Sequence, residues 1–304
     1  MTVKLSDMLV TNAAGMVKTE AEARALLNSA VTRITVGSIT LEPRQGNLGE
    51  NYYYSPKRRT AWNSRGLPNP GIEATIAWLG EFRKECNDAG KELAVSIAGF
   101  SPEECGELAG RVMPHVDATE FNGGCGNVWK DNKQKPIPSY FPELMGESLA
   151  CIGREIDKVD VKYSPVTDVT VVREGVRVMV GSKIVRRVTA VNTFPNQRDL
   201  RDEEHGEGEA LAWRESEDAD LKHLGGLSGA ELLDVADETV TALLSMLPRT
   251  IPVIGCGGIF SGEDAMRSLD RGARGFAIGT AFFEHGPRIF SDVLEQASEL
   301  VGEM

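Results

Sequence analysis

Strand-like and helix-like segments alternate along all 304 residues of this chain, and this alternation predicts a (β/α)8 barrel. Eight strand–helix units follow one another without a linker between two halves, so we expect a single domain over residues 1–304. The alternative is a doubly wound sheet, but no Gly-x-Gly-x-x-Gly motif follows the first strand. A barrel brings the loops that follow its strands to one end, where active sites of this fold lie.

In the first half of the chain, short apolar runs bounded by turn residues predict strands. These runs lie at residues 10–14, 33–36, 93–97 and 118–122. A capping box, Thr19 to Glu22, opens a predicted helix that ends at residue 28, and a second helix is predicted at 71–87. Ser101 and Pro102 begin a third helix. Residues 37–70 are predicted to be a long polar loop.

In the second half, the same alternation continues to the end of the chain. Strands are predicted at 159–162, 187–191, 252–255 and 275–278. Helices are predicted at 146–156, 229–247, 261–271 and 287–302. Residues 168–180 are rich in β-branched side chains, which favour a strand, but their place in the alternation requires a helix.

Composition indicates a soluble globular protein, with 41% hydrophobic and 26% charged residues. The net charge of −12 argues against a nucleic-acid partner. No apolar run reaches the roughly 20 residues that span a bilayer, and no secretory signal opens the chain, so we expect no membrane association. Five scattered cysteines without CxxC spacing predict no metal site and a reducing cytoplasm. Nine of the 45 acidic residues lie between Arg201 and Asp220, a predicted solvated surface segment.

The stretch from Asp117 to Val128 carries the clearest chemical signal. A predicted strand ends at Asn122, and the chain then continues as Gly-Gly-Cys-Gly-Asn. Its glycines permit a sharp turn and close approach to a ligand. Cys125 is a possible acid–base group or nucleophile if its surroundings favour the thiolate. The alternative is a small residue in a turn at a buried strand end.

Glycine runs follow the last two predicted strands, at residues 255–259 and 278–281. Barrel enzymes often bind phosphate with these loops, because glycine lets backbone N–H groups approach an anion. A third run, 225–229, precedes a predicted helix and could complete such a cradle, for the phosphate of a substrate or of flavin mononucleotide (FMN). The alternative is three tight turns.

Polar side chains also gather at the expected carboxyl ends of the strands. Lys162 ends the predicted strand that carries Val159 and Val161, so it needs either an anionic or electron-rich partner or an escape to solvent. Asn63, Asn122, Asn127 and Asn192 fall in loops at the same rim, with Thr193 beside the last. Together they predict a pocket for a small, flat molecule that carries amide groups.

The chain resembles the class 1 dihydroorotate dehydrogenases, which are FMN-containing (β/α)8 barrels. Ten segments in the family's order carry the resemblance along nearly the whole chain. They are 12–15 (NAAG), 40–47 (TLEPRQGN), 63–69 (NSRGLPN), 96–99 (SIAG), 120–128 (EFNGGCGNV), 161–162 (VK), 191–193 (VNT), 225–229 (GGLSG), 255–259 (GCGGI) and 278–281 (IGTA).

The resemblance implies a two-electron oxidation of dihydroorotate to orotate, a reaction of pyrimidine biosynthesis. Cys125 would take the proton from C5 while hydride passes from C6 to flavin N5. The asparagines at 63, 122, 127 and 192 would hold the pyrimidine ring, with Thr193 where the family often has serine. Lys162 would lie beside flavin N1. The cofactor residues implied besides Lys162 and Asn192 are Ala14, Gly15, Gly226, Ser228, Gly229, Gly257, Gly258, Gly279 and Thr280.

Three departures from the family pattern concern the substrate. The family has a lysine three residues before the threonine of TLEPR, beside flavin and substrate, and Gly37 stands there in this chain. The family's Asn-x-Ser-Cys-Pro-Asn becomes Asn-Gly-Gly-Cys-Gly-Asn at 122–127, and the loop from Trp129 to Glu143 lacks the family's Val-Pro-Gly-Lys pattern. A flavin-dependent oxidoreductase acting on another small cyclic amide or enone is therefore the alternative. A catalytically silent flavin- or phosphate-binding barrel is a third hypothesis.

Partners are expected from the resemblance as well. Relatives are commonly dimers or larger assemblies, so we expect a homo-oligomer. No cysteine cluster for an iron–sulfur centre is present, so such a centre would have to lie on an electron-transfer partner.

Overall fold

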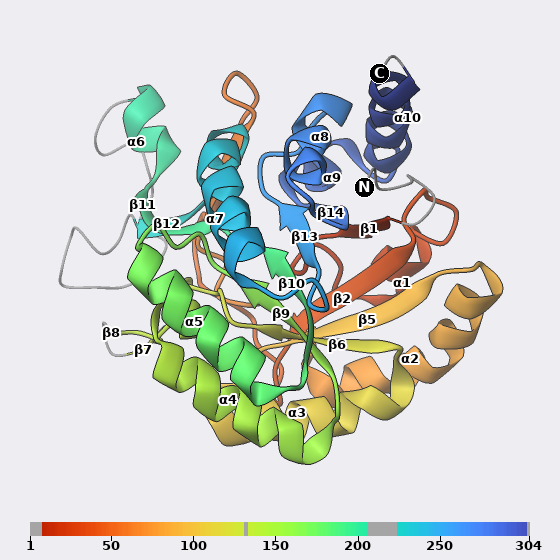
Figure 1. Cartoon of the computed structure of the whole chain (residues 1–304), viewed down its shortest axis with the longest axis vertical. Coiled ribbons are helices and arrows are strands. Elements are labelled where there is room, and N and C mark those ends of the chain that lie inside the picture. Colours follow the sequence, from red (N-terminus) through yellow and green to blue (C-terminus); the bar gives the residue numbers. More distant parts are fainter. Residues whose placement is uncertain (1–7, 131–132, 206–223, 303–304) are drawn as a thin grey trace.

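A computed structural model describes residues 8–130, 133–205 and 224–302. Its centre is a closed barrel of parallel strands in the order β1-β14-β13-β10-β9-β6-β5-β2 (Figure 1). The strands are β1 (Leu9–Asn12), β2 (Arg33–Ile39), β5 (Glu92–Ile97), β6 (Ala118–Asn122), β9 (Val159–Tyr163), β10 (Val185–Ala190), β13 (Val253–Cys256) and β14 (Gly275–Ile278). The predicted (β/α)8 barrel is confirmed, and each predicted strand is found within three residues at either end.

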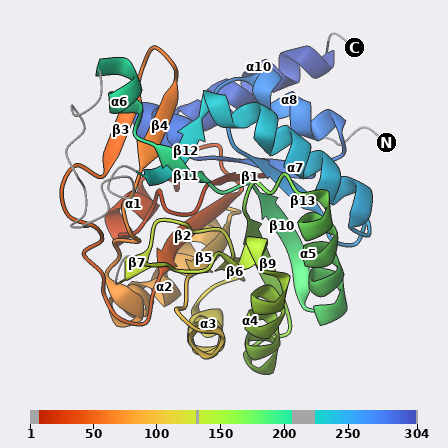
Figure 2. The ribbon, with the colours of Figure 1, turned by 90° about the vertical axis from the view of Figure 1, so that its left-hand side faces the viewer.

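Helices pack around the outside of the strands (Figure 2). They are α1 (Glu20–Arg24), α2 (Gly71–Asp88), α3 (Pro102–Val112), α4 (Pro142–Glu155), α5 (Val169–Ser182), α7 (Leu233–Met246), α8 (Gly262–Asp270) and α10 (Ile289–Gly302). The ambiguous segment 168–180 is helical, as α5. The Asp168 carboxylate accepts from the N–H of Thr170 at 2.7 Å to cap it, and Val172, Val176 and Met179 are buried. Capping and burial therefore outweigh the β-branched composition.

Three predicted helices differ from the observed ones by four residues at one end. The α4 helix begins at Pro142 instead of residue 146. The α1 helix ends at Arg24 instead of residue 28, and α7 begins at Leu233 instead of Gly229. The segment before α7 is a strand followed by a single 3₁₀ turn, Ala230–Leu232. A short helix that was not predicted, α9 (Thr280–His285), follows β14 directly.

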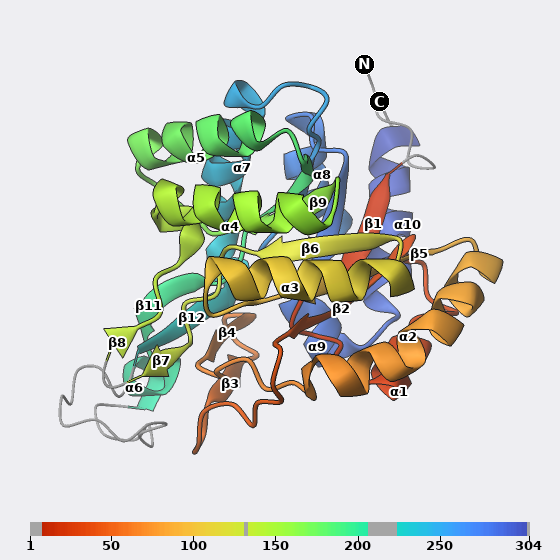
Figure 3. The ribbon, with the colours of Figure 1, turned by 90° about the horizontal axis from the view of Figure 1, so that it is seen from below.

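A second sheet covers the end of the barrel where the strands finish, and it was not predicted. Its strands β3 (Tyr52–Ser55), β4 (Thr60–Asn63), β11 (Phe194–Arg198) and β12 (Leu224–Gly229) pair in the order β11-β12-β4-β3 (Figure 3). The predicted polar loop 37–70 thus contains two strands, and the glycine run 225–229 is a strand instead of a turn. Gly225 is needed because a Cβ there would lie 2.5 Å from the buried Trp62 ring.

The remaining elements lie on the same side of the molecule. They are the short hairpin β7 (Trp129–Lys130) and β8 (Lys133–Gln134), and α6 (Leu200–His205). Most of the acidic segment expected to be solvated, residues 206–220, lies outside the described residues. Arg201 at its start is buried and forms an ion pair with Asp199 at 2.6 Å, so the expectation is wrong for this residue.

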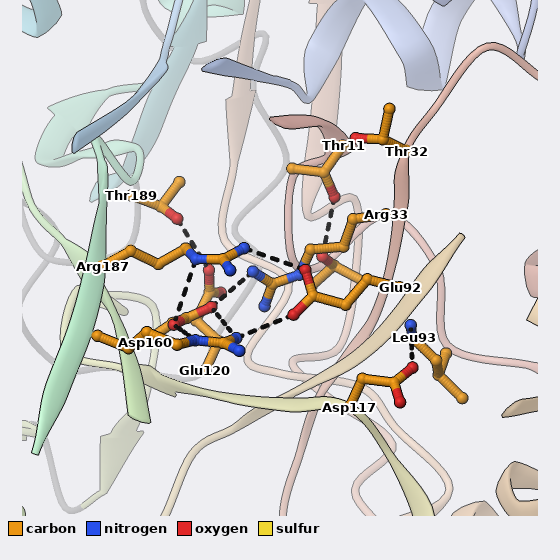
Figure 4. Close-up of polar contacts among 12 residues, drawn as sticks. Thr11, Thr32, Arg33, Glu92, Leu93, Asp117, Glu120, Asp160, Arg187 and Thr189 are labelled. Carbon is orange, nitrogen blue, oxygen red and sulfur yellow. Dashed lines mark hydrogen bonds and ion pairs between the residues drawn. The ribbon is translucent and has the colours of Figure 1, made fainter. Parts of the chain in front are cut away.

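The opposite end of the barrel is filled by a network of charged side chains (Figure 4). Asp160 of β9 is fully buried and accepts hydrogen bonds from Arg33 at 2.5 Å and Arg186 at 2.8 Å. Arg187 is paired with Glu92 at 3.0 Å. Because these residues lie near the beginnings of their strands, they are remote from the end that carries active sites in this fold and serve the stability of the barrel.

Candidate active site

A cavity opens at the carboxyl ends of the barrel strands, with about 1090 Å³ of free space counted to its mouth. Its wall contains every residue implied by the resemblance except Gly226. A Cβ on Gly226 would lie 2.3 Å from Thr193 Oγ1, so this glycine makes room for a wall residue without being one.

Cys125 reaches the cavity from the loop after β6. A Cβ on the preceding Gly124 would lie 2.7 Å from Asn192 Cβ, so glycine is required for this loop to approach the end of β10. Burial raises the pKa of the Cys125 thiol above its ordinary value. The backbone N–H of Asn127, which donates to the sulfur, and the nearby charges of Lys135, Lys18 and Arg44 oppose that rise. The thiol is thus protonated at neutral pH but surrounded by groups that favour its ionisation.

The four asparagines form two hydrogen-bonded pairs on the cavity wall. Asn192 Nδ2 donates to Asn122 Oδ1 at 3.1 Å, and Asn127 Nδ2 donates to Asn63 Oδ1 at 2.8 Å. Asn122 is fixed further by its donation to Ser38 Oγ at 2.7 Å. Each carboxamide is therefore held in one orientation while it lines the cavity, which suits recognition of a flat molecule with amide edges.

Lys162 enters the cavity from inside the barrel and is only 2% exposed. Its partner among the described residues is Cys256 at the end of β13, whose sulfur lies 2.9 Å from the ammonium nitrogen. A thiol is a weak acceptor, and an ammonium has three donors. Lys162 therefore keeps bonding capacity for a group in the cavity. The sequence did not predict Cys256 as a site residue, because it lies within the glycine run 255–259.

The glycine segments after β13 and β14 lie side by side at one part of the cavity wall. Gly257 and Gly258 have φ angles of +122° and +76°, which favour glycine. Within the described residues, their amide N–H groups have no protein acceptor. Thr280 opens α9 next to Gly279, and its hydroxyl lies 3.0 Å from that of Ser228. This region offers donors to an anion.

Comparison with known proteins identifies the family. A family model described as dihydroorotate dehydrogenase matches residues 3–301. The chain belongs to the dihydroorotate dehydrogenase family. Its members are FMN-dependent oxidoreductases that act on a CH–CH bond of dihydroorotate, and this protein is accordingly a flavoprotein oxidoreductase.

Individual relatives are distant but similar over most of their length. Dihydroorotate dehydrogenase (fumarate) of Trypanosoma cruzi (strain CL Brener) is 29% identical over 296 residues, which cover 95% of this chain and 88% of that protein. The catalytic subunit of dihydroorotate dehydrogenase B (NAD(+)) from Methanopyrus kandleri is 28% identical over 92% of this chain and 82% of its own. The structure of DHODH from Eimeria tenella in complex with ferulenol has the same fold, with a TM-score of 0.80 and 19% identity over 97% of this chain and 81% of that one.

The cavity of this family member fits FMN on two observations. The free amides at Gly257 and Gly258 suit a phosphate, and the buried Lys162 ammonium suits an electron-rich ring. No group of three or more His, Cys, Asp or Glu side chains that could hold a metal ion is found within residues 8–130, 133–205 and 224–302.

Two cations in the cavity wall, Lys18 and Arg65, were missed from the sequence. Lys18 Nζ donates to the carbonyl of Pro68 at 2.5 Å, and the Arg65 guanidinium lies 5.4 Å from the centre of the Phe283 ring. Arg65 lies within the segment 63–69 that carries the resemblance, and Lys18 lies three residues after the segment 12–15. Neither residue lies in a sequence motif that distinguishes it from the other lysines and arginines of the chain.

Proposed function

We propose that this protein oxidises dihydroorotate to orotate, with Cys125 as the base that removes the C5 proton. The observation that carries the proposal is that Cys125, Lys162 and both asparagine pairs line one cavity at the carboxyl ends of the barrel strands. Bound FMN would supply the acceptor for the hydride that leaves C6. Proton and hydride leave neighbouring carbons, and a C5=C6 double bond forms, so the substrate loses two electrons and two hydrogens.

The proposed base needs to be a thiolate, because only that form accepts a proton. The partial positive charge of the Asn127 N–H and the charges of Lys135, Lys18 and Arg44 stabilise the thiolate. Closure of the cavity by substrate excludes water and strengthens these interactions. The Cys125 thiol therefore depends on these groups to ionise.

The asparagine pairs supply the orientation of the ring. Asn63 and Asn127 are hydrogen-bonded to each other, and so are Asn122 and Asn192. A carboxamide presents one donor side and one acceptor side, which complements the N–H and C=O groups of a dihydropyrimidine. Thr193 stands beside Asn192, whose Oδ1 accepts from the Thr193 N–H at 2.8 Å.

Lys162 and the glycine segments are assigned to the cofactor. Lys162 would offer a fixed positive charge to the reduced, negatively charged ring of FMN and so stabilise it. The amides of Gly257 and Gly258, with Ser228, Gly229, Gly279 and Thr280, would hold the phosphate. Ala14 and Gly15 line the wall after β1, where no atom lies within 4 Å of a Cβ built on Gly15.

Anaerobic reduction of the purified flavoprotein tests the proposal. Dihydroorotate should bleach the flavin absorption of the wild-type protein, and Cys125→Ala should keep its FMN but be reduced ~10²-fold more slowly, since general-base catalysis contributes about this factor. Cys86→Ala, which removes a buried thiol from α2, is the matched control and should be reduced at the wild-type rate. Unaltered reduction of the Cys125 variant would remove it as the base.

A second candidate function is oxidation of another cyclic amide or enone, and the glycine at position 37 favours it. The family places a lysine there, and this chain offers no side chain. Dihydrouracil has the same ring as dihydroorotate without the carboxylate, so comparing the two as reductants separates the candidates. Faster flavin reduction by dihydrouracil, or no reduction by dihydroorotate at saturation, would support the second function.

A further inference from the structure

Position 37 has no space for a side chain in this fold. Gly37 has a φ of +106°, and a Cβ there would lie 2.4 Å from the carbonyl oxygen of Ser96 and 2.9 Å from the amide nitrogen of Ile39. Both contacts are with backbone atoms, which cannot rotate away. The end of β2 therefore cannot carry the family's lysine, and a cation for the substrate has to come from another element.

The loop after β1 is hydrogen-bonded to Gly37, the position at which the family has a lysine. Gly37 N–H donates to Val17 O at 2.8 Å, and Gly15 N–H donates to Gly37 O at 2.5 Å, so residues 15–17 run alongside Gly37 as an antiparallel bridge. The next residue in that loop is Lys18, which lines the cavity. Lys18 thus brings an ammonium group into the cavity wall from the loop that adjoins Gly37.

The Lys18 ammonium is held in place but not neutralised. It donates to Pro68 O at 2.5 Å, a carbonyl without formal charge, and it has two further N–H groups. Burial, and then the nearby charge of Arg65, lower the pKa of Lys18 to about 8, while Cys125 and Glu22 act in the opposite direction. An anionic group in the cavity beside Lys18 would stabilise its charged form.

Lys18 is better placed than Arg65 to meet the reacting end of a substrate. The charge of Lys18 acts on Cys125, whereas Arg65 is directed to the aromatic ring of Phe283, which is itself 44% exposed. We propose that Lys18 binds the anionic group of the substrate, which is the carboxylate of dihydroorotate if the proposed function holds, and so determines specificity for an acidic cyclic amide. The identity of the acid rests on the proposed function. The presence of an anion site does not depend on it.

The first test compares Lys18→Met and Lys18→Arg with Arg65→Met, all as FMN-loaded proteins. Orotate binding is measured from the change it causes in the flavin absorption. Lys18→Met should weaken binding about 10- to 100-fold, as expected for loss of a charge-assisted hydrogen bond, and should raise KM for dihydroorotate more than it lowers kcat. Lys18→Arg should restore most of the affinity. Arg65→Met should change it by less than about threefold.

Discrimination between substrates should change with the charge. The wild-type protein should prefer dihydroorotate to dihydrouracil, and Lys18→Met should reduce that preference about tenfold or more, because only the first substrate carries a carboxylate. Unchanged orotate affinity in Lys18→Met, or a larger loss in Arg65→Met, would overturn the inference.

A readout that needs no substrate separates this inference from the proposed function. Iodoacetate and iodoacetamide both alkylate a cysteine thiolate, but only iodoacetate carries a carboxylate, so the ratio of their rates at Cys125 reports a neighbouring cation whatever the thiolate fraction. Mass spectrometry of the Cys125 peptide gives both rates. The ratio should fall about tenfold in Lys18→Met and stay near the wild-type value in Arg65→Met. An unchanged ratio of alkylation rates in Lys18→Met rejects the anion site. If the ratio falls in Lys18→Met but dihydroorotate does not reduce the flavin of the wild-type protein, only dihydroorotate is rejected as the substrate.

Discussion

Cys125 is held between groups that act on its proton in opposite directions. Burial favours the neutral thiol, whereas the Asn127 N–H and the charges of Lys135, Lys18 and Arg44 favour the thiolate. The Lys18 charge is in turn weakened by burial and by Arg65, and favoured by Cys125 and Glu22. Catalysis depends on the charge of Cys125 and substrate binding on the charge of Lys18, so the two should have different pH profiles.

At the residue scale we therefore expect two opposite pH dependences. The pKa of Cys125 is raised, so the first-order rate of flavin reduction at saturating dihydroorotate should increase with pH from 7 to 9, by close to tenfold per unit. Lys18 has a pKa of about 8 and loses its charge above it, so orotate affinity should fall as pH rises through 8. Stopped-flow reduction and spectral titration measure the two separately. A reduction rate that is flat across this range in the wild type would contradict the Cys125 assignment.

At the scale of elements, the sheet β11-β12-β4-β3 ties the cavity mouth together. Gly226 of β12 pairs with Asn63 of β4, and the Trp62 indole donates to Gln197 O of β11 at 3.1 Å. Asn63, which is paired with Asn127 in the cavity wall, thus takes its position from strands far apart in the sequence. The glycine run at 225–229 therefore serves mainly the packing of β12 against β4.

We expect Gly225→Ala to disturb both stability and the site. Its Cβ would lie 2.5 Å from the Trp62 ring, and overpacking of this kind costs about 1–3 kcal/mol. Displacement of β4 should also raise KM through Asn63. Gly181→Ala in the last turns of α5 is the control, because no atom lies within 4 Å of the added Cβ and alanine is the better helix former. Urea unfolding and steady-state kinetics measure the pair, and equal stability of the two variants would contradict the argument.

At the scale of the whole molecule, the barrel separates the cavity end from a charged network at the other end. Burial alone would raise the pKa of Asp160, but Arg33, Arg186 and Arg187 hold it below its ordinary value. Because the folded-state pKa is depressed, the stabilisation is present above about pH 4 and is lost as pH falls through the folded-state value.

Asp160→Asn should destabilise the protein strongly without changing the cavity. Removing one partner of a buried ion pair costs about 3–5 kcal/mol, because Arg33 is left buried without its carboxylate. Glu174→Gln on the surface of α5, which breaks an exposed pair with Arg177, should cost less than about 1 kcal/mol. Chemical unfolding above pH 6 measures both. Folded Asp160→Asn should have its flavin reduced at the wild-type rate. A slower rate would show that the network also acts on the site.

No helix of the described residues is long and apolar enough to cross a membrane. The single domain over 1–304, the homo-oligomer, the cytoplasmic location and the electron-transfer partner stay predictions. The last three depend on the assembly or the cell and not on the fold of one chain.

The sequence by itself determined the barrel and most of its cavity wall. Strand and helix periodicity act locally, so the order of elements could be read along the chain, and Cys125, Lys162 and the asparagines lie at strand ends that a parallel barrel must bring together. Only the tertiary structure decided which residues from separate elements meet. The partner of Lys162 is Cys256, which lies 94 positions away. Gly37 of β2 forms a bridge with Val17, which brings the loop that carries Lys18 beside it. Such contacts depend on packing and backbone geometry in three dimensions, for which no local pattern in the chain is a signal.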